Sequence, residues 1–268
     1  MRHRPRLSLL AVVVTALTCC PTPNAAWSQI PPGLAELAPA VQSADYRGDR
    51  AELSRLAGRL EIPGEARLEA YRQYWRAFAW WRRGINGFNE TPTPDDLLAD
   101  FECCAAAFRA ALAIDPAFED ARSGLAGCLG GQMALVVRLT PERRQAVLEE
   151  GVPLWRSLDA TNPRSLWILG GMRLAAPPPS GGNPEAAAEL YHRGLEAVRA
   201  ELRVAGSGPV WMPRWGGPEL LMSLAYLHSH GATPNREAAK AYALGALAGA
   251  PEWHYVRDIL LPQIEALP

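Results

Sequence analysis

Apolar residues recur at helical spacing in residues 103–128 more regularly than elsewhere in the chain. Cys104, Phe108 and Ala111 are separated by four and then three residues, so they share one face of a predicted helix. Pro116 ends that helix, because proline lacks the backbone N–H that a further turn would need. The pattern therefore predicts an amphipathic helix whose apolar face has small residues around one aromatic ring.

A second helix is predicted directly after the first. Residues 119–129 carry another apolar stripe at helical spacing, before Gly130 and Gly131 interrupt it. The connection between the two stripes is short, so the two helices are expected to be antiparallel neighbours. The small residues lie where these helices must interlock.

The spacing resembles the second helix of the tetratricopeptide repeat (TPR), where a small residue precedes an aromatic residue by four positions, alanine follows three later and proline five after that. Cys104, Phe108, Ala111 and Pro116 match it, with Cys104 in place of the usual alanine. The resemblance implies an all-α fold of antiparallel helix pairs stacked as a TPR-like α-solenoid. Degenerate copies repeat the spacing in whole or in part at Gly151, Trp155, Leu158 and Pro163, at Ala187, Tyr191 and Gly194, and at Ala239, Ala243, Ala246 and Pro251.

Helix starts recur along the chain with the same local chemistry. A residue that can cap a helix is followed by proline, which suits the first helical position. This arrangement predicts helices beginning after Thr93, Thr140, Asn183 and Thr233. The units between these starts differ in length, so the repeats are degenerate.

The start of the chain has the pattern of a secretory leader. Three arginines precede an apolar run over residues 7–17, which is short for a membrane span. Two processing routes stay open: cleavage after Ala26-Trp27-Ser28, or lipid attachment at Cys20 or Cys19 in a sequence that resembles a lipobox. We therefore expect an exported protein of the bacterial periplasm or envelope that meets a membrane only through such an anchor.

Four segments are predicted along the chain. Residues 1–28 form the leader, residues 29–44 a tail with a short helix interrupted near Pro39, residues 45–260 the TPR-like domain and residues 261–268 a C-terminal tail. The whole chain has a formal charge of −1, and removing the three leader arginines gives −1 − 3 = −4. A slightly acidic chain of this kind does not suggest nucleic-acid binding.

Aromatic residues are concentrated in two places, and each has two interpretations. In one, they line a groove or rim for a peptide, sugar or apolar ligand, with Arg82 and Asn86 holding an anionic group. In the other, which we favour, the rings fill the core between helices. The candidate surface residues lie in a predicted helix at residues 65–85 and at its end, and in a predicted loop at residues 206–218; they are Tyr71, Trp75, Trp81, Arg82 and Asn86, and Trp211 and Trp215.

Three cysteines follow the leader, an odd number for an oxidising compartment. One interpretation is a disulfide from Cys103 or Cys104 to Cys128, which leaves one thiol free or paired with another chain. The interpretation that we favour is that these residues are buried thiols in place of alanine at close helix contacts. A catalytic or metal-binding thiol would need a basic or histidine partner nearby, and the local sequence offers only Arg109 and Arg122.

The sequence contains none of the metalloprotease, Walker, nucleophile-elbow or dinucleotide-binding motifs. His228 and His230 are two residues apart on a predicted helix, so they point in different directions and no shared metal is expected. We expect no cofactor and no catalysis. The favoured hypothesis is a scaffold that binds a protein or peptide.

The alternative hypothesis is a small-molecule-binding accessory component of an envelope transporter. It rests on a Pro- and Gly-rich connection before an alanine-rich helix at residues 176–188, which loosely resembles exported TPR proteins such as the T-component of TRAP transporters. An enzyme is a remote alternative. An open groove would favour the peptide partner, and a closed aromatic cavity near Trp75 and Trp81 would favour the solute.

Overall fold

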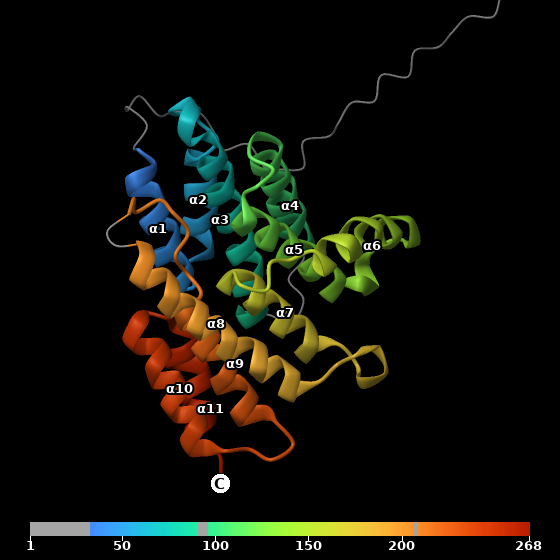
Figure 1. Ribbon diagram of the computed structural model, residues 1–268, viewed down its shortest axis with the longest axis vertical. Coiled ribbons are helices and arrows are strands. Elements are labelled where there is room, and N and C mark those ends of the chain that lie inside the picture. The colour runs from blue at the N-terminus through green and yellow to red at the C-terminus, as the bar shows by residue number, and fades with distance from the viewer. Residues whose placement is uncertain (1–32, 91–95, 206–207) are drawn as a thin grey trace, which may run out of the picture.

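The computed structural model describes residues 33–90, 96–205 and 208–268, and this part of the chain is helical without any strand (Figure 1). The predicted all-α class is therefore confirmed. A π-helical segment, Tyr255–Leu260, leads directly into the last helix. The α-helices are α1 (Leu34–Tyr46), α2 (Arg50–Arg59), α3 (Glu69–Glu90), α4 (Leu97–Ile114), α5 (Glu119–Ala134), α6 (Pro141–Arg156), α7 (Pro163–Ala175), α8 (Pro184–Ala205), α9 (Gly217–His230), α10 (Arg236–Gly249) and α11 (Leu261–Glu265).

Successive helices pack as antiparallel pairs in two rows. The odd row consists of α1, α3, α5, α7 and α9, and each of these helices contacts the next member of the row. The even row consists of α2, α4, α6, α8 and α10, and each packs beside the odd-row helix that precedes it. Figure 1 shows this succession from α1 in blue to α10 and α11 in red. The arrangement is compatible with an α-solenoid, as the sequence predicted.

The interlocking of α4 and α5 is confirmed at the level of side chains. The ring of Phe108 lies against the backbone of Gly124, where an added Cβ would come within 2.1 Å of the ring. Phe108 and Cys104 are completely buried. Cys104 is joined by a disulfide to Cys128, with their Cα atoms 6.2 Å apart, so a covalent bond also links the two helices.

Glycine does not interrupt α5, although the sequence predicted an interruption. The helix continues through Gly130 and Gly131 to Ala134. A Cβ on Gly131 would lie 2.4 Å from the ring of Phe101, so the missing side chain allows α4 to approach closely. Close packing between helices outweighs the weak helix propensity of glycine at this point.

Two of the predicted helix starts are confirmed and one is shifted. Thr140 accepts a hydrogen bond from the backbone N–H of Arg143 at the start of α6. Asn183 accepts one from the N–H of Ala186 at the start of α8. The start after Thr233 is wrong by two residues, because Asn235 caps α10 instead. Thr93 lies outside the described residues.

The helical unit also includes residues 33–44 and 261–268, which the sequence placed outside the repeat domain. α1 is continuous through Pro39, and its Ala38, Val41 and Ala44 are completely buried. At the other end Ile264 in α11 is completely buried. Both segments therefore share the core with residues 45–260. None of the described helices combines the length and the hydropathy that a membrane span requires.

The first and last members of the odd row meet, which we call the end-to-end junction. The hydroxyl of Tyr46 in α1 donates a hydrogen bond to Glu219 in α9 (3.0 Å). Its ring contacts Trp253 with centroids 5.2 Å apart, and Ser43 donates to Glu252 (2.7 Å). The row therefore curves back on itself, and its two ends are held by side chains more than 170 residues apart in sequence.

Candidate binding surface

The aromatic residues singled out in the sequence meet in one buried cluster on the odd row. Trp215 contacts Phe78 and Trp81 of α3 and Trp167 of α7, with ring centroids 5.5 to 5.6 Å apart. Its indole N–H donates to the hydroxyl of Tyr74 (2.6 Å). Trp215 is 1 % exposed and Trp81 is 2 % exposed, so neither ring presents a surface to a partner.

The connection between α8 and α9 reaches this cluster as an irregular segment, residues 208–216, with a turn at residues 210–211. The indole of Trp75 in α3 donates a hydrogen bond to the backbone carbonyl of Trp211 (2.7 Å). Trp211 is partly buried against the main core, whereas Val210 and Met212 beside it are exposed. The segment thus packs its tryptophans against the helices of the odd row and exposes smaller apolar side chains on the surface.

Arg82 and Asn86 hold an anionic group, as predicted for this helix end, but the group belongs to the protein itself. Nε of Arg82 lies 2.7 Å from a carboxylate oxygen of Asp45, and Asn86 donates to the other oxygen of Asp45 (2.9 Å). Asp45 is completely buried in α1. The predicted contact of Arg82 and Asn86 with an external anion is therefore wrong, because an internal carboxylate occupies both donors.

The packing decides between the two interpretations of the aromatic residues. Trp81, Arg82, Asn86 and Trp215 are at most 5 % exposed, so their assignment to a ligand or partner surface is wrong, and the core interpretation holds for them. Trp75 is only 2 % exposed, but it also lines the hollow beside the second half of α1. Tyr71 and Trp211 are partly buried and keep an accessible edge. Tyr71 rests on Phe118 with ring centroids 4.9 Å apart. The rings around Trp81 pack against each other instead of lining a cavity.

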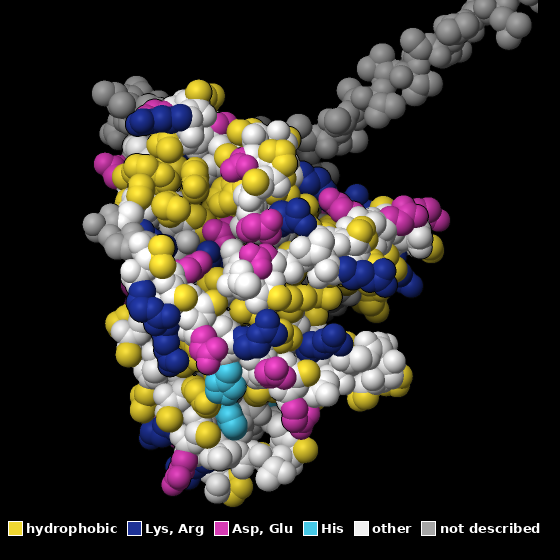
Figure 2. All heavy atoms as spheres, in the orientation of Figure 1, with side chains coloured by type: hydrophobic (Ala, Val, Ile, Leu, Met, Phe, Trp, Pro, Cys, Tyr) yellow, Lys and Arg dark blue, Asp and Glu magenta, His cyan; other side chains and the backbone are white. Residues whose placement is uncertain are grey.

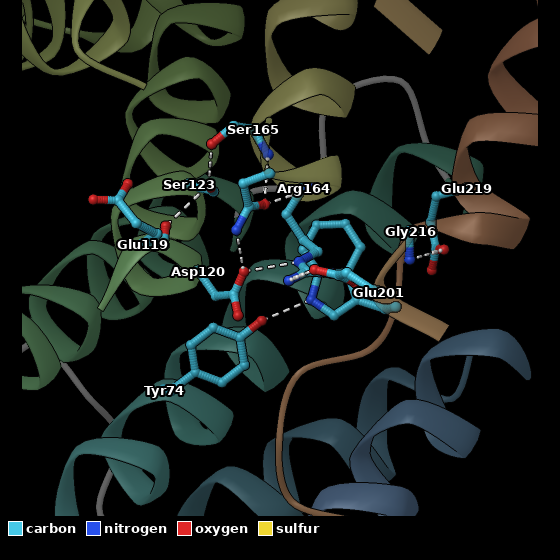
Figure 3. A network of polar contacts seen from close by, with 11 residues as sticks. Tyr74, Glu119, Asp120, Ser123, Arg164, Ser165, Glu201, Gly216 and Glu219 are labelled. Carbon is cyan, nitrogen blue, oxygen red and sulfur yellow. Dashed lines mark hydrogen bonds and ion pairs between the residues drawn. The ribbon is translucent and has the colours of Figure 1, made fainter. Parts of the chain in front are cut away.

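A polar network fixes the neighbouring helices around this core (Figure 3). Arg164 in α7 donates to Asp120 in α5 (2.8 Å) and, through both terminal nitrogens, to Glu201 in α8 (2.6 and 2.7 Å). Ser123 and Ser165 are hydrogen-bonded across α5 and α7 (2.7 Å). These contacts join helices of the protein to one another and position the odd row. The candidate binding surface is therefore sought around α1.

Two hollows flank α1 and form what we call the α1 surface. The larger, about 340 Å³, lies between the second half of α1, Val210 and the corner after α10. The smaller, about 160 Å³, lies between the first half of α1 and residues 59–72. The larger hollow offers polar groups from Gln42, Ser43, Tyr46 and Glu252.

Exposed apolar side chains border both hollows. Val210, which lines the larger hollow, is 59 % exposed, and Ile62, which lines the smaller one, is 38 % exposed. Met212 is 41 % exposed. Figure 2 shows hydrophobic side chains gathered over this region, near α1 and the connection between α8 and α9. Of the candidate surface residues from the sequence, Trp75 lines the larger hollow. The sequence did not indicate the other members, because they come from separate segments and have no shared spacing.

The other candidate residues have mixed outcomes. The Cys104–Cys128 disulfide agrees with the cross-link interpretation and replaces the buried-thiol interpretation for these two residues. The ring of His228 stacks on Tyr242, and His230 stacks on Tyr226. Among the described residues, no group of three or more His, Cys, Asp or Glu side chains could hold a metal ion. Cys19, Cys20 and the cleavage site after the leader lie outside the described residues.

Comparison with known proteins adds no relative from which a function could be transferred: no family model, no curated protein and no solved structure matches the chain.

Proposed function

We propose that this protein is a non-catalytic, exported TPR-like scaffold that binds a protein or peptide partner through the α1 surface. The observation that carries the proposal is the pair of hollows on either side of α1, bordered by exposed Val210 and Ile62. An extended segment lying along α1 could place apolar side chains in both hollows. Open hollows with an apolar border suit a peptide or protein surface.

Polar groups in the larger hollow support a partner with hydrogen-bonding main-chain groups. Gln42, Ser43 and Glu252 face this hollow, and an extended peptide presents N–H and C=O groups along its whole length. The volume of about 340 Å³ is sufficient for one or two side chains. The small-solute alternative has less support, because Trp81 is enclosed by other rings and lines neither hollow, and Trp75 lines only the open larger hollow.

Site-specific photo-cross-linking in the intact envelope tests the proposal. A photoreactive residue at position 210 is expected to capture a defined partner, identified by mass spectrometry. The same residue at Val137, which is 86 % exposed in the turn between α5 and α6, is the matched control and should capture nothing at comparable yield.

The captured partner must then bind the purified protein directly. Val210→Glu is expected to weaken that binding at least about tenfold, because a buried charge at an interface lacks a partner. Val137→Glu should leave the binding unchanged. Equal capture from positions 210 and 137, or direct binding that is insensitive to Val210→Glu, would show that the α1 surface is not the binding site.

A further inference from the structure

The end-to-end junction encloses a group of ionisable side chains away from solvent. Asp45 and Tyr46 come from the last turn of α1, Arg82 from α3 and Glu219 from the first turn of α9. Asp45 and Glu219 are 0 % exposed, and Arg82 is 2 % exposed. Three helices that are distant in sequence thus bring two carboxyl groups and one guanidinium into the same interior space.

Each carboxyl group has its own set of donors. Asp45 is paired with Nε of Arg82 (2.7 Å) and accepts a hydrogen bond from Asn86 (2.9 Å). Glu219 accepts hydrogen bonds from the hydroxyl of Tyr46 (3.0 Å) and from the backbone N–H of Gly216 (2.8 Å). Tyr46 in turn accepts one from Gln42 (3.0 Å). Glu219 therefore has neutral donors, while the guanidinium is engaged by Asp45.

The charges in this space do not balance when both carboxyl groups are ionised. Among the described residues, Arg82 is the cation that acts on both Asp45 and Glu219, and the aromatic rings of Phe78 and Trp167 cover the guanidinium. Tyr46 is the remaining ionisable group beside them, and it is neutral in this pH range because burial raises its pKa further above its ordinary value. Two negative charges would thus face one positive charge, and an uncompensated buried charge is strongly unfavourable.

We propose that Asp45 and Glu219 together form a buried proton-binding site that holds one proton in the folded protein at neutral pH, and that loss of this proton loosens the end-to-end junction. The proton belongs to the pair, since two carboxyl groups that interact this closely titrate together. Burial raises the pKa of Asp45 and also of Glu219, against the opposing effect of Arg82 on both.

The direction of the pH dependence follows from this arrangement. In the unfolded chain, carboxyl groups release their protons near their ordinary pKa of about 4. The folded protein retains one proton to a higher pH, so in the interval above pH 4 it binds more protons than the unfolded chain does. The stabilisation is fully present below the unfolded pKa and is lost as pH rises through the folded pKa.

Loosening the junction would reach the α1 surface directly. Tyr46 both donates to Glu219 and lines the larger hollow. Glu219 holds the N–H of Gly216, at the end of the segment that carries Val210. A change in protonation at Asp45 and Glu219 therefore alters the contacts on two sides of that hollow.

Equilibrium unfolding in urea between pH 5.5 and pH 8.0 tests the proposal. In the wild type, the unfolding constant is expected to rise with pH, by up to about tenfold per pH unit where one proton separates the two states. Glu219→Gln should flatten this dependence, because the remaining Asp45–Arg82 pair is balanced. Glu237→Gln, at an exposed position of α10, is the matched control and should keep the wild-type dependence.

Another buried carboxyl group, that of Asp100, also contributes to the pH dependence of unfolding, and a separate variant measures its contribution. Burial raises the pKa of Asp100, in α4, to about 6 despite the neighbouring Arg83, so Asp100→Asn measures its share of the pH dependence. The dependence that remains in Asp100→Asn is expected to disappear in the double variant with Glu219→Gln. An equal pH dependence in Asp100→Asn and in the double variant would overturn the proposal.

Infrared spectroscopy supplies a readout that needs no variant to fold. The wild type at pH 7 is expected to show the C=O band of a protonated carboxylic acid, and this band should fade on titration to higher pH. Over the same pH range, amide hydrogen exchange in α1 and at the start of α9 should accelerate by more than the intrinsic pH dependence of the exchange rate. A spectrum at pH 7 with carboxylate bands alone would refute the buried proton.

Discussion

Replacement of Trp215 by alanine is the most direct measure of what the segment 208–216 contributes to the fold. The side chain is 1 % exposed and contacts rings from α3 and α7. A tryptophan buries about 200 Å² of surface, which at about 25 cal/mol per Å² corresponds to about 5 kcal/mol. Measured losses for Trp→Ala in cores are about 3–5 kcal/mol, so we expect a loss of that size.

Trp215→Phe separates ring packing from the hydrogen bond. Phenylalanine keeps an aromatic ring but cannot donate to the hydroxyl of Tyr74, which the indole N–H approaches to 2.6 Å. Loss of a partner for a buried polar group costs about 1–3 kcal/mol. The double variant with Tyr74→Phe should recover about 1 kcal/mol of this loss, because the hydroxyl without a partner is then absent.

The assay is urea unfolding at 25 °C followed by far-ultraviolet circular dichroism, with the free energy of unfolding as the measured quantity. Met212→Ala is the control in the same segment, and its 41 % exposed side chain should change stability by no more than about 0.5 kcal/mol. A loss below about 1 kcal/mol for Trp215→Ala would refute the conclusion that this segment is part of the core. Equal losses for Trp215→Ala and Met212→Ala would refute it as well.

Two further predictions concern the pair α4 and α5. Reduction of the Cys104–Cys128 disulfide, whose cysteines are 24 residues apart in sequence, should lower the free energy of unfolding by about 3 kcal/mol. An equal loss in the Cys128→Ala variant would assign the effect to this bond. Unchanged unfolding under reducing conditions would contradict the prediction. Gly124→Ala should cost about 1–3 kcal/mol, since the new Cβ would lie 2.1 Å from the buried ring of Phe108. Gly130→Ala in the same helix meets no atom within 4 Å and should stabilise by up to about 1 kcal/mol, so a common sign for the two variants in thermal unfolding would contradict the packing.

Local patterns in the sequence were sufficient to locate the helices and their pairing, although not every helix end. The spacing of Cys104, Phe108 and Ala111 predicts an interlocked pair, and the structure places Phe108 against Gly124 as the pattern requires. Thr140 and Asn183 cap helices because capping depends on residues within three positions of one another. Such features depend on short-range geometry, so a single sequence contains them.

The tertiary structure decided which of the conspicuous residues are accessible. Trp75, Trp81 and Trp215 are of the residue type that often lines a binding groove. The curvature of the odd row brings α3, α7 and the segment 208–216 together, and this packing buries the three side chains. The α1 surface and the junction of Asp45, Arg82 and Glu219 join segments more than 130 residues apart, with no periodicity to reveal them. Helical spacing determines which side of a helix is apolar, whereas the side that remains exposed depends on how the pairs stack in space.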